Sequence, residues 1–157
     1  SKRMTAALVA KGIFDSIKKA EPGAKIILMG DLNDDPDCAS ITKGLNAGKN
    51  KEMNASNTLF DCMDSLFTSG SGTLSYKDKW NLFDQMIVTK SLCNNQGSGL
   101  QFQTACIFNK EMVKEREGKF AGTPWRTFAG TKYLGGYSDH FCVYIFLNCL
   151  PKKSTKP

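Results

Sequence analysis

Residues 25–36 read KIILMGDLNDDP, an apolar run that ends in a group of polar side chains. The run at 25–29 is continuous and holds two β-branched residues, which predicts a strand covered on both faces. Directly after it, residues 30–36 hold three carboxylates and one amide. Clustered carboxylates repel one another unless a cation or a basic group compensates. This turn is therefore a candidate site for a metal ion or for proton transfer.

Two other interpretations of this turn can be weighed from its residues. A calcium-binding loop would begin with the same D-x-N-x-D order, but Pro36 stands where that loop needs glycine and Thr42 where it needs glutamate. These two residues exclude a calcium loop. In a purely structural interpretation, Asn33, Asp34 and Asp35 cap backbone groups before the next helix. The residues alone leave the structural and the chemical interpretations open.

Length and composition place the chain among single globular domains. It has 157 residues, of which 41% are hydrophobic and 23% charged. No apolar run approaches the roughly 20 residues that cross a bilayer, and the polar start at residues 1–4 is unlike a secretion signal, so we expect a soluble chain. The compartment stays open. The net charge of +6 favours acidic partners such as phosphates, although the cations are scattered as on an ordinary solvated surface.

The periodicity on both sides of residues 25–36 predicts alternating helices and strands. Apolar residues at helical spacing precede it, and Glu21-Pro22-Gly23 ends that helix. Downstream we expect a short helix at 39–45, a loop at 48–58, helical spacing at 59–67, strands at 73–76, 80–88, 100–108 and 141–147, a charged helix or loop at 110–119, and an aromatic, glycine-rich loop at 122–136. The six cysteines show no metal-finger spacing and are expected to be free thiols.

Asp84 is unusual because it lies inside a predicted strand among large apolar residues. A carboxylate is expensive to bury unless something pairs with it. The chain has one histidine, His140, which adjoins Asp139 at the start of the last predicted strand. A carboxylate bonded to one imidazole nitrogen fixes the tautomer and raises the basicity of the other, as general acid–base chemistry requires. The structural alternative is a buried pair without a catalytic role.

Three ordered motifs resemble the signatures of the endonuclease/exonuclease/phosphatase superfamily, which has the deoxyribonuclease I-like fold. They are Gly30-Asp31-Leu32-Asn33, then residues 84–88 followed by Ser91-Leu92, and then Ser138-Asp139-His140. The resemblance covers residues 1–150 and leaves a basic tail at 151–157. It implies an α/β fold, half of a four-layer α/β sandwich, with a mostly antiparallel sheet of roughly five strands and flanking helices.

The resemblance implies a metal-dependent phosphodiesterase or phosphatase and a role for each matched residue. Asp31 would orient or activate the attacking water, and Asn33 would hold that water or a phosphate oxygen. Asp139 would help to bind Mg²⁺ or Mn²⁺, whose charge stabilises the transition state. His140, oriented by Asp84, would contact the scissile phosphate or transfer a proton. The product would be a cleaved phosphoester.

Further expectations concern substrate and partners. Arg126, Tyr76 and Trp80 are weak candidates for substrate contacts, with surface packing as the alternative. The substrate is a phosphoester and possibly a nucleic acid, and its identity stays open. Domains of the family reach about 250 residues or more, close to the usual ceiling for one core, and their first half supplies an Asn, a Glu and a second His. We therefore expect this chain to be the carboxyl-terminal half, inactive without an amino-terminal partner.

Two other functional classes stay open. One is a non-catalytic module on the same scaffold that binds nucleic acid or phosphate through its basic surface. The other is purely structural, with the acidic turn as a helix cap and Asp84 with His140 as a buried pair.

Overall fold

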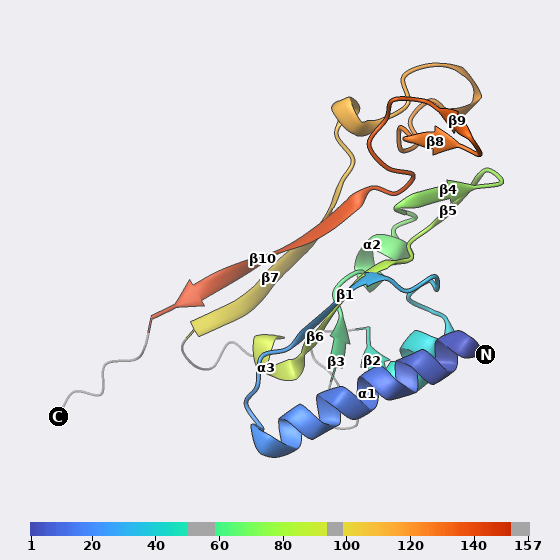
Figure 1. Cartoon of the computed structure of the whole chain (residues 1–157). Helices are drawn as coiled ribbons and strands as arrows, with labels where there is room; N and C mark the ends of the chain where they lie inside the picture. Colours follow the sequence, from blue (N-terminus) through green and yellow to red (C-terminus); the bar gives the residue numbers. More distant parts are fainter. Residues whose placement is uncertain (50–58, 94–98, 152–157) are drawn as a thin grey trace.

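The computed structural model describes residues 1–49, 59–93 and 99–151, and its centre is a four-stranded sheet. The strand order is β1 (Ile27–Asp31), β6 (Asp84–Thr89), β3 (Leu59–Asp61) and β2 (Ala47–Gly48) (Figure 1). β6 runs antiparallel to both of its neighbours, and β2 runs parallel to β3. Most of the predicted tail at 151–157 and most of the predicted loop at 48–58 lie outside the described residues.

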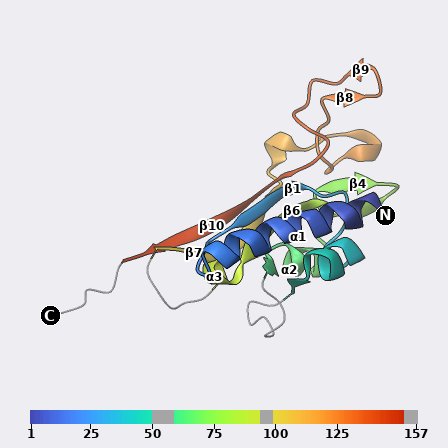
Figure 2. The ribbon, with the colours of Figure 1, turned by 60° about the horizontal axis from the view of Figure 1, so that its bottom comes forward.

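Helix α1 (Lys2–Ala20) covers one face of this sheet (Figures 1 and 2). The Ser1 hydroxyl accepts a hydrogen bond from the Met4 N–H at 3.3 Å and caps the helix. α1 buries Ala7 and Phe14 on the sheet and on η1 (Ser40–Leu45), a short π-helix. This layer positions the carboxyl-terminal end of the acidic turn, because η1 follows that turn in the chain.

A two-stranded antiparallel ribbon, β7 (Gly99–Phe108) and β10 (Cys142–Leu150), covers the other face. Its side chains join those of β6 in a second core cluster that includes Met86, Val88 and Phe102. The short helices α2 (Asp64–Thr68) and α3 (Lys90–Cys93) lie beside this cluster. The sheet is therefore sandwiched between a helix and a β-ribbon.

Small hairpins and turns lie beyond the carboxyl end of β1 (Figure 1). They are the hairpin of β4 (Leu74–Tyr76) with β5 (Lys79–Asn81) and the hairpin of β8 (Phe128–Ala129) with β9 (Lys132–Tyr133). The segment expected as a charged helix or loop instead forms two 3₁₀ turns, η2 (Glu111–Val113) and η3 (Gly118–Phe120). The six cysteines all lie in the described part of the chain and form no disulfide there, in agreement with the prediction of thiols. Among the described residues, no helix has the length and apolar character to cross a membrane.

Three local expectations were wrong. β1 is not covered on both faces: it is an edge strand, and Met29 is 71% exposed. Residues 59–67 form β3 and then α2, because pairing with β6 outweighs the helical spacing of the side chains. Residues 80–88 are split by Leu82, whose backbone N–H donates to Asp35 Oδ1 at 2.6 Å and turns the chain between β5 and β6.

Candidate functional site

The sheet register places two carboxylates side by side at the carboxyl end of β1. Because β1 and β6 are antiparallel, Asp31 at the end of β1 lies directly opposite Asp84 at the start of β6. Beyond Asp31 the chain turns sharply: the Asn33 N–H donates to Asp31 Oδ1 at 2.9 Å, and Asn33 has a left-handed backbone with φ of 55°. Asparagine tolerates that conformation because its side chain can bond locally. The turn therefore presents Asp31 and Asn33, both exposed, at one edge.

Asp84 binds the only histidine of the chain. His140 Nδ1 lies 2.7 Å from Asp84 Oδ2, and the Thr73 hydroxyl donates to the same oxygen. The Phe141 N–H donates to the Thr73 carbonyl oxygen at 2.9 Å, which ties the start of the last strand to the segment that leads into β4. The Ser138 hydroxyl accepts from the His140 N–H at 3.1 Å. The imidazole is thus held by contacts that involve Asp84 on β6, Thr73 before β4 and Ser138 before β10.

The two members of this pair shift each other's proton affinity. The hydrogen bond to Asp84 raises the pKa of His140 above its ordinary value; burial opposes this, and the charges of Asp84, Asp31 and Asp139 add to it. Burial alone would raise the pKa of Asp84, but the hydrogen bonds from His140 and Thr73, together with the His140 charge, outweigh it and lower that pKa. The carboxylate therefore stays ionised while the imidazole holds a proton more readily.

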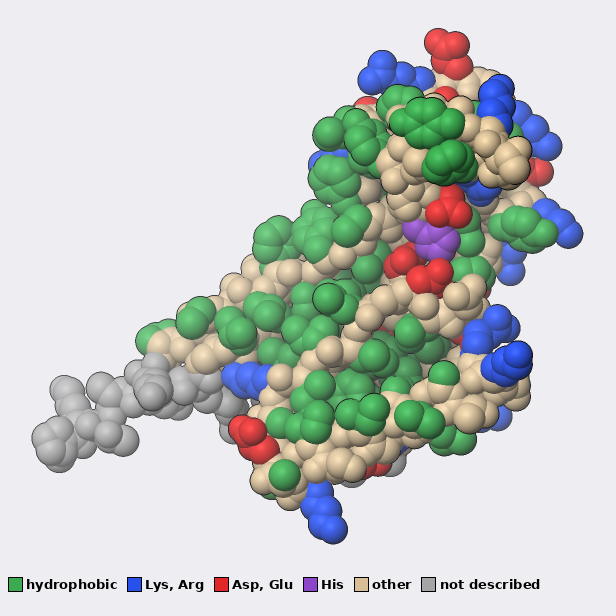
Figure 3. All heavy atoms as spheres, viewed as in Figure 1, with side chains coloured by type: hydrophobic (Ala, Val, Ile, Leu, Met, Phe, Trp, Pro, Cys, Tyr) green, Lys and Arg blue, Asp and Glu red, His purple; other side chains and the backbone are tan. Residues whose placement is uncertain are grey.

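The three sequence motifs meet at this point. The electrostatic influence on His140 comes from Asp31 on the first motif, Asp84 on the second and Asp139 on the third. Figure 3 shows the histidine in purple with carboxylates in red on both sides and hydrophobic side chains above it. Such a group can transfer a proton and can attract a cation.

The rest of the acidic turn holds the scaffold together. Asp34 pairs with Arg3 Nε at 2.8 Å and accepts a short hydrogen bond from the Ser40 hydroxyl, which links α1 to η1. Asp35 accepts from the Leu82 N–H. The turn therefore divides: Asp31 lies at the site, and its two later carboxylates anchor the neighbouring elements.

Thr73 is the site residue that the sequence did not indicate. It is fully buried, and its hydroxyl donates to the carboxylate that orients the imidazole. A threonine at the start of a predicted strand is explained equally well by strand propensity, so the sequence carried no separate signal for this role.

The three weaker candidates lie around the site rather than in it. Arg126 Nη2 donates to the Ser75 carbonyl oxygen at 3.4 Å. Tyr76 is exposed on the β4–β5 hairpin. The Trp80 ring stacks on Phe141, with ring centres 5.9 Å apart, and so packs against the residue that follows the histidine.

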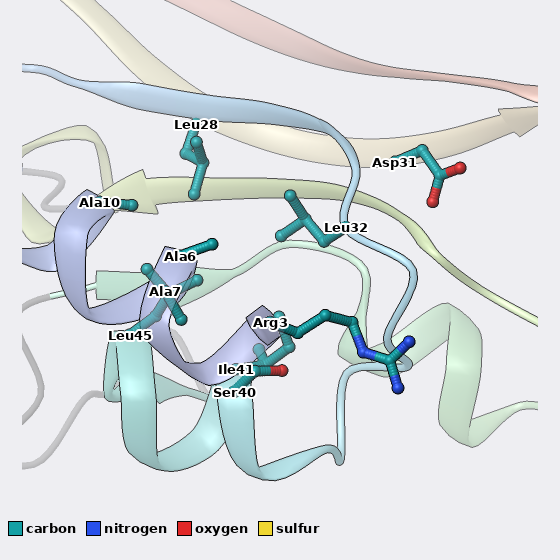
Figure 4. A pocket seen from close by; sticks show the side chains of 10 residues that line it. All are labelled: Arg3, Ala6, Ala7, Ala10, Leu28, Asp31, Leu32, Ser40, Ile41 and Leu45. Carbon is teal, nitrogen blue, oxygen red and sulfur yellow. The ribbon is translucent and has the colours of Figure 1, made fainter. Parts of the chain in front are cut away.

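A separate hollow of about 280 Å³ lies between α1, η1 and β1 (Figure 4). Its lining is mostly apolar, with Arg3 and Asp31 at one end, and the Asp31 carboxylate lies apart from the apolar side chains. A second apolar hollow of about 170 Å³ shares Ala10 and Leu28 with it and continues along α1 and β1. These hollows form a groove beside the site.

The carboxylates at the site suit a magnesium ion that is held in part by other groups. In the part of the chain that the structure describes, no three His, Cys, Asp or Glu side chains are grouped closely enough to hold a metal ion by themselves. Mg²⁺ usually keeps several waters and binds through one or two carboxylates together with substrate phosphates. The exposed carboxylates of Asp31 and Asp139 fit that mode.

An imidazole oriented by a carboxylate, with further acids beside it, has the groups that general acid–base catalysis requires. Comparison with known families makes this specific. The model of the endonuclease/exonuclease/phosphatase family matches residues 1–149, and the chain belongs to that family of phosphoester hydrolases. The predicted family and the α/β fold class are thereby confirmed. Searches of curated proteins and of solved structures found no match.

Proposed function

We propose that this chain carries the acid–base part of a Mg²⁺- or Mn²⁺-dependent phosphodiesterase or phosphatase site. The observation that supports it is the 2.7 Å pair of Asp84 with His140, flanked by Asp31 and Asp139, in a chain of a phosphoester hydrolase family. The wholly structural alternative explains the pair but gives no reason for two further exposed carboxylates beside it.

Each side chain has a distinct role in this proposal. His140 uses Nδ1 to bind Asp84, which leaves Nε2 to meet the substrate, and its raised pKa lets it keep a proton for a phosphate oxygen or the leaving group. Asp31 accepts a hydrogen bond from the attacking water and orients it. The Asn33 amide donates to that water or to a phosphate oxygen.

Asp139, with Asp31, would hold the divalent cation, which neutralises the charge that develops on the phosphoryl oxygens. Asp31 and Asp139 are oxygen donors, which both Mg²⁺ and Mn²⁺ accept.

The test is a hydrolysis panel with Mg²⁺ on DNA, RNA, an inositol phosphate and a simple diester, using the protein that carries residues 1–157. We expect His140→Ala and Asp31→Ala each to lower kcat/KM by at least about 100-fold on the substrate that is cleaved, since general acid–base catalysis contributes about 10²–10⁴-fold. Asp15→Ala removes an exposed carboxylate that pairs with Lys11 on α1 and serves as the matched control. Unchanged kcat/KM in both site variants would refute the proposal.

A non-catalytic binding module is the second candidate. It is favoured by the lack, among the described residues, of a complete metal-binding group and by the net charge of +6. Such a module would bind nucleic acid with a steep dependence on salt and without an effect of Mg²⁺. Binding of that kind, with no cleavage of any substrate in the panel, would favour the module over the enzyme.

We further propose that an amino-terminal half of the domain completes the site by docking on the open edge of β1. This edge strand exposes Ile27 and Met29, and the adjoining side of α1 exposes Val9 and Ile13. Exposed apolar surface next to an unpaired strand edge favours association with another strand. The groove between α1 and β1 leads from that edge to Asp31, so a docked segment would reach the site.

A further inference from the structure

A hollow of about 270 Å³ opens beside the candidate site, on the side of the long loop before the last strand. It is lined by Thr127, Phe128, Tyr137, Ser138 and Asp139. Two of these residues belong to the third motif, and the Ser138 hydroxyl accepts the hydrogen bond from the His140 N–H. The hollow therefore adjoins the place where the phosphate would bind.

The two aromatic rings of this hollow are exposed but held in place. Phe128 is 55% exposed and Tyr137 is 62% exposed. The rings of Phe128 and Tyr133 pack edge to face with their centres 5.3 Å apart. The rings of Tyr137 and Trp125 pack in the same way with their centres 5.7 Å apart. The Tyr137 N–H also donates to the Trp125 carbonyl oxygen at 2.8 Å. Burial in the core does not explain rings that are positioned and yet more than half exposed, whereas a planar ligand that covers them would.

The chemistry of the lining selects among ligands. Its five residues include two aromatic rings, hydroxyl groups and one carboxylate, but no Lys or Arg. The second phosphate of a polyphosphorylated ligand would be repelled by the Asp139 carboxylate, and no Lys or Arg in the lining would offset that repulsion. An uncharged aromatic ring can stack on Phe128 or Tyr137, and its polar edge can bond to the hydroxyls.

We propose that this hollow is a subsite for the nucleobase of a nucleotide whose phosphate lies against His140. The proposal rests on the proposed function, because it assumes that the phosphate binds at the Asp84–His140 pair. It adds the substrate class: a nucleotide phosphoester rather than an inositol phosphate or a simple alkyl ester. Phe128 and Tyr137 then determine specificity and take no part in the chemical step.

Equilibrium binding tests this without requiring turnover. The dissociation constants of AMP and of ribose 5-phosphate are measured by calorimetry on the 157-residue chain in the presence of Mg²⁺. We expect AMP to bind more tightly by roughly 5- to 150-fold, the range that one stacked base contributes. Phe128→Ala and Tyr137→Ala should each reduce this preference at least several-fold and leave the dissociation constant of ribose 5-phosphate unchanged.

Control variants separate this inference from the proposed function. Phe120→Ala removes an aromatic ring that is 62% exposed outside the hollow and should keep the full preference for AMP. His140→Ala should weaken AMP and ribose 5-phosphate equally.

Each result has a defined meaning. Equal affinities in the wild-type chain, no binding of AMP, or a preference that survives both aromatic substitutions would overturn the subsite. If AMP and ribose 5-phosphate bind equally and both lose affinity in His140→Ala, the phosphate site stands without the base subsite. If the preference for AMP follows the aromatic residues but His140→Ala changes neither affinity, the subsite stands and the proposed phosphate site fails.

Discussion

The Asp84 carboxylate accepts hydrogen bonds from two side chains, the His140 imidazole and the Thr73 hydroxyl, in a half-buried position. Asp84 therefore acts on the imidazole more directly than either of the exposed acids, and its hydrogen bond contributes most to the raised pKa of His140. This pair could be predicted from the sequence, because a carboxylate within an apolar strand needs a partner and the chain has one histidine. The part played by Thr73 could not, since a threonine in a strand needs no special explanation.

Replacement of Asp84 by Asn should lower the pKa of His140 toward its ordinary value, because the main interaction with the protonated ring is lost. An NMR titration measures this directly, since the ring signals of a single histidine need no assignment. Asp15→Asn, at an exposed position of α1 where the carboxylate pairs with Lys11, should leave the pKa of His140 unchanged. An unaltered His140 pKa in Asp84→Asn would contradict the role assigned to the pair.

The pH dependence of stability should show the same pair. Because the pKa of His140 is raised, His140 contributes fully to the free energy of unfolding below about pH 6.5. This contribution is lost as the pH rises through the pKa of His140 in the folded chain. Because the pKa of Asp84 is lowered, Asp84 contributes to the free energy of unfolding above about pH 3.9. This contribution is lost as the pH falls through the pKa of Asp84 in the folded chain. Urea denaturation should thus find Asp84→Asn most destabilised between about pH 4 and pH 6.5. An equal loss of stability in Asp84→Asn at pH 9 would show that the pair stabilises the fold by packing and not by its charges.

The pKa of Asp61 is raised, whereas that of Asp84 is lowered. Burial raises the pKa of Asp61 to about 7, since only its Oδ1 has a hydrogen bond among the described residues, from the Met63 N–H at 2.8 Å. The folded chain therefore keeps a proton that the unfolded chain releases, and stability should fall between about pH 4 and pH 7, by up to roughly 4 kcal/mol.

Asp61→Asn imitates the protonated form and should remove most of this pH dependence, so that the variant is more stable than the wild-type chain at pH 8. Urea denaturation at pH 5 and pH 8 measures both. A parallel decline in the two proteins would assign the pH dependence to other groups.

At the scale of elements, α1 and η1 approach each other unusually closely. A Cβ atom on Gly44 would lie 2.8 Å from the Ala7 Cβ and 3.0 Å from the Met4 Sδ. This approach brings Arg3 on α1 within reach of Asp34 in the acidic turn. The position of the turn therefore depends on a glycine outside every sequence motif.

Gly44→Ala should destabilise the fold by about 1–3 kcal/mol, the usual effect of overpacking. Gly12→Ala is a matched control on α1, where an added Cβ would meet no atom within 4 Å. There alanine should stabilise the helix by about 0.5–1 kcal/mol. Chemical denaturation of both variants tests the contrast, and a neutral or stabilising Gly44→Ala would show that the two helices can separate without cost.

Local patterns predicted the elements unevenly, for physical reasons. The long helix α1 and the ribbon strands β7 and β10 could be read from periodicity and flanking turn residues. β3 could not, because Leu59–Asp61 becomes a strand only by pairing with β6, a contact that no local window contains. The exposure of β1 was also unpredictable, because an edge strand and a central strand share the same apolar run.

For the whole molecule, the meeting of three distant motifs at one end of the sheet could be expected from their order, but the open edge of β1 needed the structure. That edge and the exposed side of α1 leave apolar groups without cover in the described part of the chain. In the same described part, no three His, Cys, Asp or Glu side chains lie closely enough together to hold a metal ion.

If an amino-terminal half completes the site, as proposed above, the 157-residue chain alone should hydrolyse phosphodiesters at least about 100-fold more slowly than the chain together with that half. Hydrolysis of a chromogenic diester with Mg²⁺, compared between the two proteins, measures this. Strong Mg²⁺-dependent cleavage by the chain alone that disappears in His140→Ala would show that no further segment is needed.

The direct opposition of Asp31 and Asp84 across β1 and β6 also bears on how the molecule matures. Side chains alternate between the faces of a sheet, so a slip of one residue would put Gly30 opposite Asp84 and turn Asp31 away. The acids can surround the imidazole only after those two strands have found their final alignment. A newly made chain should consequently acquire the altered titration of its single histidine late, as the last sign that refolding is complete.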